Sequence, residues 1–173
     1  MPSTLERPAI DEDTLRLARQ IFQWVRAGDL QRLEPLLAQG LPANLRNENG
    51  DSLLMLAAYH GRMDVTRALL AAGADPELSN DRGQTPLIAA AFKGFTGIVR
   101  LLLDHGAQVD GRGADGRTAL MTAAMFDRID VIDFLLERGA RPDMRDGSGM
   151  TALDAAHTMG AARAVQHLAA TAH

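Results

Sequence analysis

The 173-residue sequence contains no cysteine, which excludes a disulfide framework, a thiolate nucleophile and a cysteine-ligated zinc site. Its histidines show no i, i+4 pair of the kind that binds zinc on a helix, and no His-Glu-x-x-His motif occurs. We therefore expect no metal ion, no cofactor and no catalytic residue. The histidines are His60, His105, His157, His167 and His173.

Aromatic residues and long apolar runs are also scarce. Aromatics make up 4% of the chain, so the core has to consist mainly of Leu, Ala, Val, Ile and Met. No stretch of about 18 apolar residues occurs, and the polar residues 1–13, with Pro2 and Pro8, do not resemble a signal peptide. We expect a flexible segment at 1–13, no membrane segment and a cytoplasmic location.

The chain also lacks an excess of positive charge, since its formal net charge is −4. Sequence-independent affinity for nucleic acid comes from clustered Lys and Arg, so this balance argues against a nucleic-acid partner. A hydrophobic share of 46% and a charged share of 23% are typical of a globular protein. The many Ala and Arg residues, without lysine-rich tails, suggest a bacterial source.

What the sequence does have is an internal repeat. Gly50, Gly83, Gly116 and Gly149 follow one another at intervals of 33 residues. Other series keep the same interval; they are Gly73, Gly106 and Gly139, and the leucine pairs at 36–37, 69–70, 102–103 and 135–136. Self-similarity at such a period is the signature of a stacked repeat protein.

Each repeat unit predicts two helices and a loop. Thr85 can cap a helix through its side-chain oxygen, and Pro86 suits the first helical position. This helix ends near Gly94, and a second one, with apolar residues at 98, 99, 102 and 103, ends at Gly106. Residues 107–116 form a turn-rich connector. The equivalent capping residues are Ser52, Thr118 and Thr151.

These units resemble the ankyrin-repeat family. The resembling segments are Gly-Gln-Thr-Pro-Leu at 83–87, Gly-Arg-Thr-Ala-Leu at 116–120 and Gly-Met-Thr-Ala-Leu at 149–153. The resemblance implies an all-α solenoid of stacked antiparallel helix hairpins with projecting β-hairpin-like loops. It implies one domain at 14–172, with a divergent N-terminal cap at 14–45, full repeats at about 46–78, 79–111 and 112–144, and a truncated C-terminal cap at 145–172.

The sequence departs from the family pattern in two ways. Where the family usually has a histidine after Thr-Pro-Leu, this chain has Met55, Ile88, Met121 and Asp154, so apolar packing has to replace the hydrogen bonds of that histidine. The first unit has Trp24-Val25 in place of small alanines, and Pro35 in its second helix removes one hydrogen bond. Irregular terminal units are expected of caps.

Two glycine-rich segments could suggest chemistry but are better explained by the repeat. Residues 111–116 have glycines at the spacing of a dinucleotide-binding loop, yet they follow a helix and a turn rather than a strand. Ser148 lies between two glycines, but the Gly-x-Ser-x-Gly spacing of a nucleophile turn is absent. We interpret both segments as loops between units.

Partners of ankyrin repeats usually meet the loop tips and the exposed end of the first helix of each repeat. Carried over by register, this resemblance predicts a binding stripe made of Arg46, Asp51, Tyr59, His60, Arg82, Gln84, Phe92, Lys93, Arg112, Arg117, Met125 and Phe126. Aromatic residues, Met and Arg are enriched in protein interfaces. The alternative is that Phe92 and Phe126 fold into the core, where we expect Phe95 and Phe134.

The leading hypothesis for function is therefore a non-enzymatic, monomeric module that binds an unidentified protein partner through its concave face and loop tips. A second hypothesis is a dedicated regulator of one enzyme, such as an inhibitor, an immunity protein or a stress-response accessory protein. A third is a small enzyme with a site in the groove. Fold alone does not exclude the third hypothesis.

Overall fold

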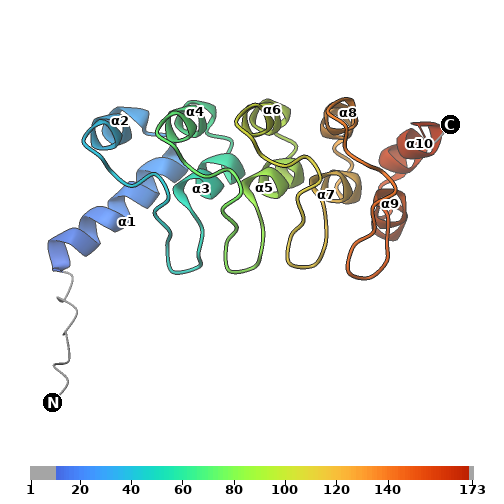
Figure 1. Ribbon diagram of the computed structural model, residues 1–173, viewed down its shortest axis with the longest axis horizontal. Coiled ribbons are helices and arrows are strands. Elements are labelled where there is room, and N and C mark those ends of the chain that lie inside the picture. The colour runs from blue at the N-terminus through green and yellow to red at the C-terminus, as the bar shows by residue number, and fades with distance from the viewer. Residues whose placement is uncertain (1–10, 172–173) are drawn as a thin grey trace, which may run out of the picture.

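The computed structural model describes residues 11–171, which form ten helices arranged in two parallel rows (Figure 1). The inner row consists of α1 (Glu12–Ala27), α3 (Leu53–Tyr59), α5 (Pro86–Lys93), α7 (Ala119–Met125) and α9 (Ala152–Met159). The outer row consists of α2 (Leu30–Ala38), α4 (Met63–Ala71), α6 (Thr96–Asp104), α8 (Ile129–Glu137) and α10 (Ala162–Thr171). Each inner helix pairs with the outer helix that follows it in the chain.

The predicted caps begin four of the inner helices. The hydroxyl oxygen of Thr85 accepts a hydrogen bond from the backbone N–H of Ile88 at 3.3 Å, which satisfies one of the unpaired N–H groups of the first turn. Ser52, Thr118 and Thr151 do the same for α3, α7 and α9. Gly94 ends α5 in the left-handed conformation, with φ of 80°. The predicted caps are confirmed.

Stacking of neighbouring units builds one continuous core. The alanine pairs at 57–58, 90–91 and 123–124 are buried on the inner helices, where small side chains let the helices approach closely. Leu69, Leu102 and Leu135 are fully buried at equivalent positions of the outer helices. Phe134 is buried and Phe95 packs against the core, as expected from the sequence.

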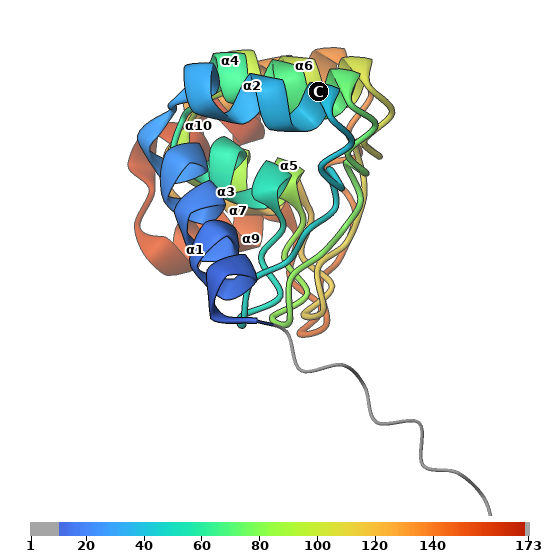
Figure 2. The same cartoon turned by 90° about the vertical axis from the view of Figure 1, so that its left-hand side faces the viewer.

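Four loops project from the stack to one side, as the view along the stack shows (Figure 2). We number their tips loop 1 (46–51), loop 2 (79–84), loop 3 (112–117) and loop 4 (145–150). Each is closed as a narrow hairpin; in loop 2 the N–H of Asn80 donates to the carbonyl of Gln84 at 3.0 Å. One backbone hydrogen bond joins each loop to the next, such as Ala114 N–H to the Gly83 carbonyl. The predicted fold class is confirmed.

The departures from the family pattern have structural explanations. Met55, Ile88 and Met121 are buried, so apolar packing takes the place of the usual histidine in these three units. Pro35 lies inside α2, which nevertheless continues to Ala38. Helix α1 begins at Glu12, two residues before the expected domain boundary, because the Asp11 carboxylate caps it. The predicted flexible segment falls mostly on residues 1–10, which lie outside the described residues.

Within residues 11–171, no helix is both long enough and apolar enough to span a bilayer.

Candidate functional site

Three aromatic side chains from consecutive units form a continuous ladder. The rings of Tyr59 and Phe92 are nearly parallel, with centroids 6.2 Å apart, and Phe126 meets Phe92 edge to face at 4.6 Å. Tyr59 is 40% exposed, whereas Phe92 and Phe126 are half-buried. The two phenylalanines therefore pack against each other at the surface instead of joining the core. Such ring pairs contribute about 0.5–1.5 kcal/mol beyond their area burial.

Cationic side chains surround the N-terminal end of this ladder. The Lys93 ammonium lies 5.1 Å from the centre of the Tyr59 ring, within cation–π range, and the His60 ring meets Tyr59 edge to face. Desolvation lowers the pKa of His60, and the nearby charges of Arg26, Arg62 and Lys93 lower it further. The contributions of these three cations, rather than the desolvation, reflect a positive potential around His60.

The largest hollow on this face lies between loops 2 and 3, and we call it the central groove. It has a volume of about 500 Å³. Its floor is apolar and consists of Ile88 and Phe92 from α5 with Thr122, Met125 and Phe126 from α7 and its C-terminal end. Its walls are residues 82–84 of loop 2 and residues 113–115 and 117 of loop 3.

A second hollow adjoins it, between loops 1 and 2, and we call it the N-terminal groove. Its volume is about 300 Å³, and it shares Arg82 and Gln84 with the central groove. Nine of the twelve predicted site residues line the two grooves. They are Asp51, Tyr59, His60, Arg82, Gln84, Phe92, Arg117, Met125 and Phe126. The structure thus brings most of the predicted stripe together on one continuous face.

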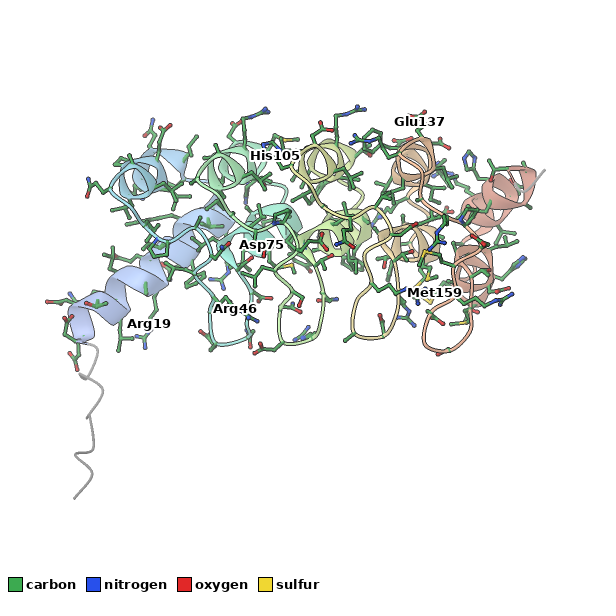
Figure 3. The ribbon with its side chains drawn as sticks, in the orientation of Figure 1. Arg19, Arg46, Asp75, His105, Glu137 and Met159 are labelled. Atoms are coloured by element: carbon green, nitrogen blue, oxygen red, sulfur yellow. The ribbon has the colours of Figure 1, made fainter. Side chains whose placement is uncertain are left out.

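Two of the predicted arginines instead tie loops together. Arg46 lies on loop 1 (Figure 3). Its guanidinium donates to the carbonyls of Gly50 at 2.9 Å and Ser79 at 3.1 Å, and it pairs with Asp81. Arg112 donates in the same way to the carbonyl of Arg145 at 3.1 Å. Lys93, the remaining residue, lies against Tyr59 outside both grooves.

Other charged residues of the grooves are also engaged within the chain. The Arg117 guanidinium lies 3.3 Å from a carboxylate oxygen of Asp115 and 3.5 Å from one of Asp146. Hydrogen bonding from the Met150 N–H lowers the pKa of Asp146, as do the Ser148 N–H and Arg117. Asp51 accepts a hydrogen bond from the Asn80 amide at 2.8 Å. Among the described residues, by contrast, the Arg82 guanidinium makes no ion pair or hydrogen bond.

Sequence reasoning missed Gly113 and Ile88 as groove residues. Gly113 occupies the position that in the other loops holds Asn47, Asn80 and Asp146, whose side-chain oxygens accept two backbone N–H groups each. The replacement of Asn or Asp by glycine at this one position could have indicated from the sequence that loop 3 differs from the other loops. Ile88 stands at the family histidine position, which drew attention to packing rather than to the groove.

Within residues 11–171, no three His, Asp or Glu side chains gather in a way that could hold a metal ion. On this face an apolar floor lies between walls that carry arginines, and hydrogen bonds hold the loops that form the walls. The molecule is a helical repeat solenoid, and the two grooves described above lie side by side on the face that carries loops 1, 2 and 3.

Comparison with known proteins gives the family. The family described as "Ankyrin repeats (3 copies)" matches residues 21–112, 64–146 and 110–173. The chain belongs to the ankyrin-repeat family, whose repeats are in general protein–protein interaction modules. It is similar to an ankyrin repeat protein of the bacterium Pseudomonas aeruginosa, with 57% identity over 61 residues. That match covers 35% of this chain and 36% of the relative's length.

Proposed function

We propose that this chain is a non-enzymatic interaction module that binds a partner protein through its concave face and loop tips. The main support is the pair of adjoining grooves that share Arg82 and Gln84 and expose the ladder of Tyr59, Phe92 and Phe126. Exposed apolar patches rimmed by polar residues commonly mark interaction sites. Aromatic and arginine side chains supply most binding hot spots.

The rigidity of the loops favours the same conclusion. Hydrogen bonds within each hairpin and between neighbouring loops hold the groove walls in place before any partner arrives. Binding to a preorganised surface loses less conformational entropy than binding to a mobile loop. The arginines that tie the loops thus contribute to recognition indirectly, by fixing the position of the walls.

Affinity capture from extract of the source cells tests the proposal. The test variant combines Tyr59→Ala, Phe92→Ala and Phe126→Ala. The matched control removes three other exposed apolar side chains, through Leu15→Ala, Leu17→Ala and Met159→Ala. We expect the control to retain the captured partners and the groove variant to lose them, with both variants folded by circular dichroism. Equal capture by the groove variant and the wild type would refute the proposal.

The narrower hypothesis, that the chain is a dedicated regulator of one enzyme, requires a further result from this experiment. Capture would have to return one enzyme in stoichiometric amount, and its activity would have to change when the chain is added. The hypothesis of a groove enzyme would be revived by substrate turnover that groove substitutions abolish. No arrangement of groove carboxylates specifically favours it, since Asp115 pairs with Arg117 and Asp51 is bound by Asn80.

A further inference from the structure

The junctions between neighbouring loops are not alike. Between loops 1 and 2, Arg46 binds the Ser79 carbonyl and the Asp81 carboxylate, and the Asn80 amide binds Asp51. Both interactions cross the junction through side chains.

The junction between loops 3 and 4 is also crossed by side chains. Arg112 donates to the Arg145 carbonyl, and Arg117 pairs with the buried carboxylate of Asp146. These contacts join the two loop tips, and the larger hollow of this face lies on the other side of loop 3.

Between the tips of loops 2 and 3 the described residues form one backbone hydrogen bond, from the Ala114 N–H to the Gly83 carbonyl, and no side-chain bond. Two substitutions in the repeat account for this. Ser79 stands where loops 1, 3 and 4 have arginine, and Gly113 stands where the other loops have Asn or Asp. The central groove therefore opens at the junction of loop tips that, among the described residues, no side-chain bond crosses.

The charged side chains that line the central groove are Arg82, Arg117 and Asp115, so its lining is net positive although the whole chain carries −4. Arg82 lies on the wall shared by both grooves, and its guanidinium has no partner among the described residues. The carboxylates nearby are already engaged, Asp115 by Arg117 and Asp51 by Asn80. On the far side of Arg82, the N-terminal groove adds Arg26. A ligand that reaches Arg82 therefore meets an exposed guanidinium that no carboxylate of the described residues occupies.

We infer that the central groove binds an extended peptide segment of the partner in which a bulky apolar residue is followed or preceded, within a few positions, by Asp or Glu. This inference rests on the proposed function and specifies the chemistry of its ligand. The apolar side chain packs on the floor formed by Ile88, Phe92 and Phe126, and the carboxylate accepts hydrogen bonds from Arg82. Arginine suits this role because its planar guanidinium can bind a carboxylate through two parallel bonds.

The dimensions fit such a segment. A volume of about 500 Å³ lies within the range of roughly 300–1,000 Å³ typical of ligand pockets, which is ample for one bulky side chain. The adjoining N-terminal groove continues along the stack from the shared Arg82 and Gln84. An extended chain can therefore run from one groove into the other, across the arginine.

Selection of random 12-residue peptides displayed on phage, against the full chain, tests the inference. We expect peptides selected by the wild type to share a bulky apolar residue near Asp or Glu. Selection against Arg82→Glu should instead enrich Lys or Arg at the acidic positions. For one selected peptide, made synthetically with a fluorescent label, Arg82→Glu should weaken binding by about tenfold and replacement of the acidic residue by Lys should restore it.

The control for the charge change is Arg67→Glu, on the outer helix α4, which should bind the peptide like the wild type. Arg82→Gln provides a second variant should the charge reversal disturb folding, with a smaller loss expected. Binding should also weaken as salt rises from 50 to 500 mM, because screening acts on exposed charge pairs.

The outcomes separate the inference from the proposed function. Peptides that lose binding to Phe126→Ala but show no acidic preference would overturn the inference and leave the groove as the binding site. Peptides that bind Phe126→Ala and Arg82→Glu as tightly as the wild type would overturn both. Failure to select any peptide would overturn the inference alone, and the capture experiment would then decide the proposed function.

Discussion

Helices α5 and α9 occupy equivalent places in the stack, but their side chains serve different purposes. Helix α5 carries Ile88, Phe92 and Lys93 at three positions of the repeat. At the equivalent positions α9 carries Asp154, Thr158 and Met159. Asp154 turns back to its own helix, where it accepts from the Thr151 N–H and hydroxyl, and Thr158 bonds to the Asp154 carbonyl. In the central unit Ile88 and Phe92 thus line the groove, whereas in the last unit Asp154 and Thr158 bond within their own helix.

The turns that connect inner and outer helices also differ between the central units and the last one. Gly94 begins the turn after α5 with φ of 80°, and Arg128 of the next unit packs directly over it and donates to the Phe92 carbonyl at 3.0 Å. One unit later the glycine is replaced by Asp127, which keeps a positive φ of 57°. Its carboxylate accepts a hydrogen bond at 2.7 Å from the backbone N–H of Ala164, in the first turn of α10.

Asp127 can replace the glycine because the residue of the next unit that faces it is smaller than at the other junctions. At the regular junctions a Cβ on the glycine would lie within about 3 Å of the next unit's side chain, which is Arg62, Phe95 or Arg128. At the last junction the equivalent position is Ala161, whose small side chain leaves room for the Asp127 carboxylate. Helix α10 is therefore capped by a side chain of the preceding unit, which the regular junctions do not do.

The largest expected effect is the loss of stability when a cavity is made in the core, compared between the central units and the last unit. Leu102 on α6 is fully buried with neighbouring units on both sides, whereas Leu168 on α10 is 4% exposed and has a neighbouring unit on one side only. Deletion of a buried leucine side chain costs about 2–5 kcal/mol, more where the site cannot relax. We expect Leu102→Ala to fall in the upper part of this range and Leu168→Ala in the lower part, measured by urea unfolding. Equal losses would show that the end unit is as constrained as the centre.

The next effect separates backbone strain from crowding at the glycines. Gly160→Ala should cost about 1–2 kcal/mol, because φ is 68° and no atom outside the adjacent residues lies within 4 Å of the added Cβ. Gly94→Ala should cost roughly 1 kcal/mol more, because its Cβ would lie 2.9 Å from the Arg128 Cδ and displace the hydrogen bond to Phe92. Combination of Gly94→Ala with Arg128→Ala should reduce the extra cost of crowding. No reduction in the double variant would contradict this explanation.

These examples also show what sequence alone could predict. The 33-residue interval, the capping Ser and Thr residues and the buried Phe134 follow from local periodicity and capping chemistry, and the structure has all of them. The cap from Asp127 to α10 could not be derived, because it depends on how two units stack and on the small size of Ala161. For the same reason, the sequence did not reveal that Arg46 and Arg112 bind neighbouring loops, or that the two grooves meet at Arg82.

A smaller effect tests the cap between units. Asp127→Ala keeps the left-handed strain and loses the hydrogen bond to α10, so it should destabilise the chain by about 1 kcal/mol, within the 0.5–2 kcal/mol typical of lost caps. Asp127→Gly loses the same bond but relieves the strain, so its free energy of unfolding should stay within about 0.5 kcal/mol of the wild type. Hydrogen exchange of the Ala164 amide should quicken in both. Unchanged exchange there would mean that the cap contributes nothing.

The smallest expected effect is on the pH dependence of the free energy of unfolding, which should differ between His60 at the groove and the titrating groups of the last unit. The pKa of His60 is lowered in the folded protein, first by desolvation and then by Arg26, Arg62 and Lys93, while in the unfolded chain it should lie near its ordinary value of about 6.5. Between the lowered pKa and about 6.5 the unfolded chain binds more protons, so the free energy of unfolding falls as pH decreases through this interval and is unaffected by His60 above it.

The carboxylates of the last unit respond at lower pH. The pKa of Asp154 is lowered, mainly by hydrogen bonds from Thr151, so its stabilising contribution is lost only as pH falls below its ordinary value of about 4. Urea unfolding at pH 7.5 and pH 5 should therefore show a smaller loss of stability in His60→Gln than in the wild type, with the control His157→Gln behaving like the wild type. Asp154→Asn should leave the change between these two pH values intact. An equal loss in His60→Gln and the wild type would show that the pKa of His60 is not lowered in the folded protein.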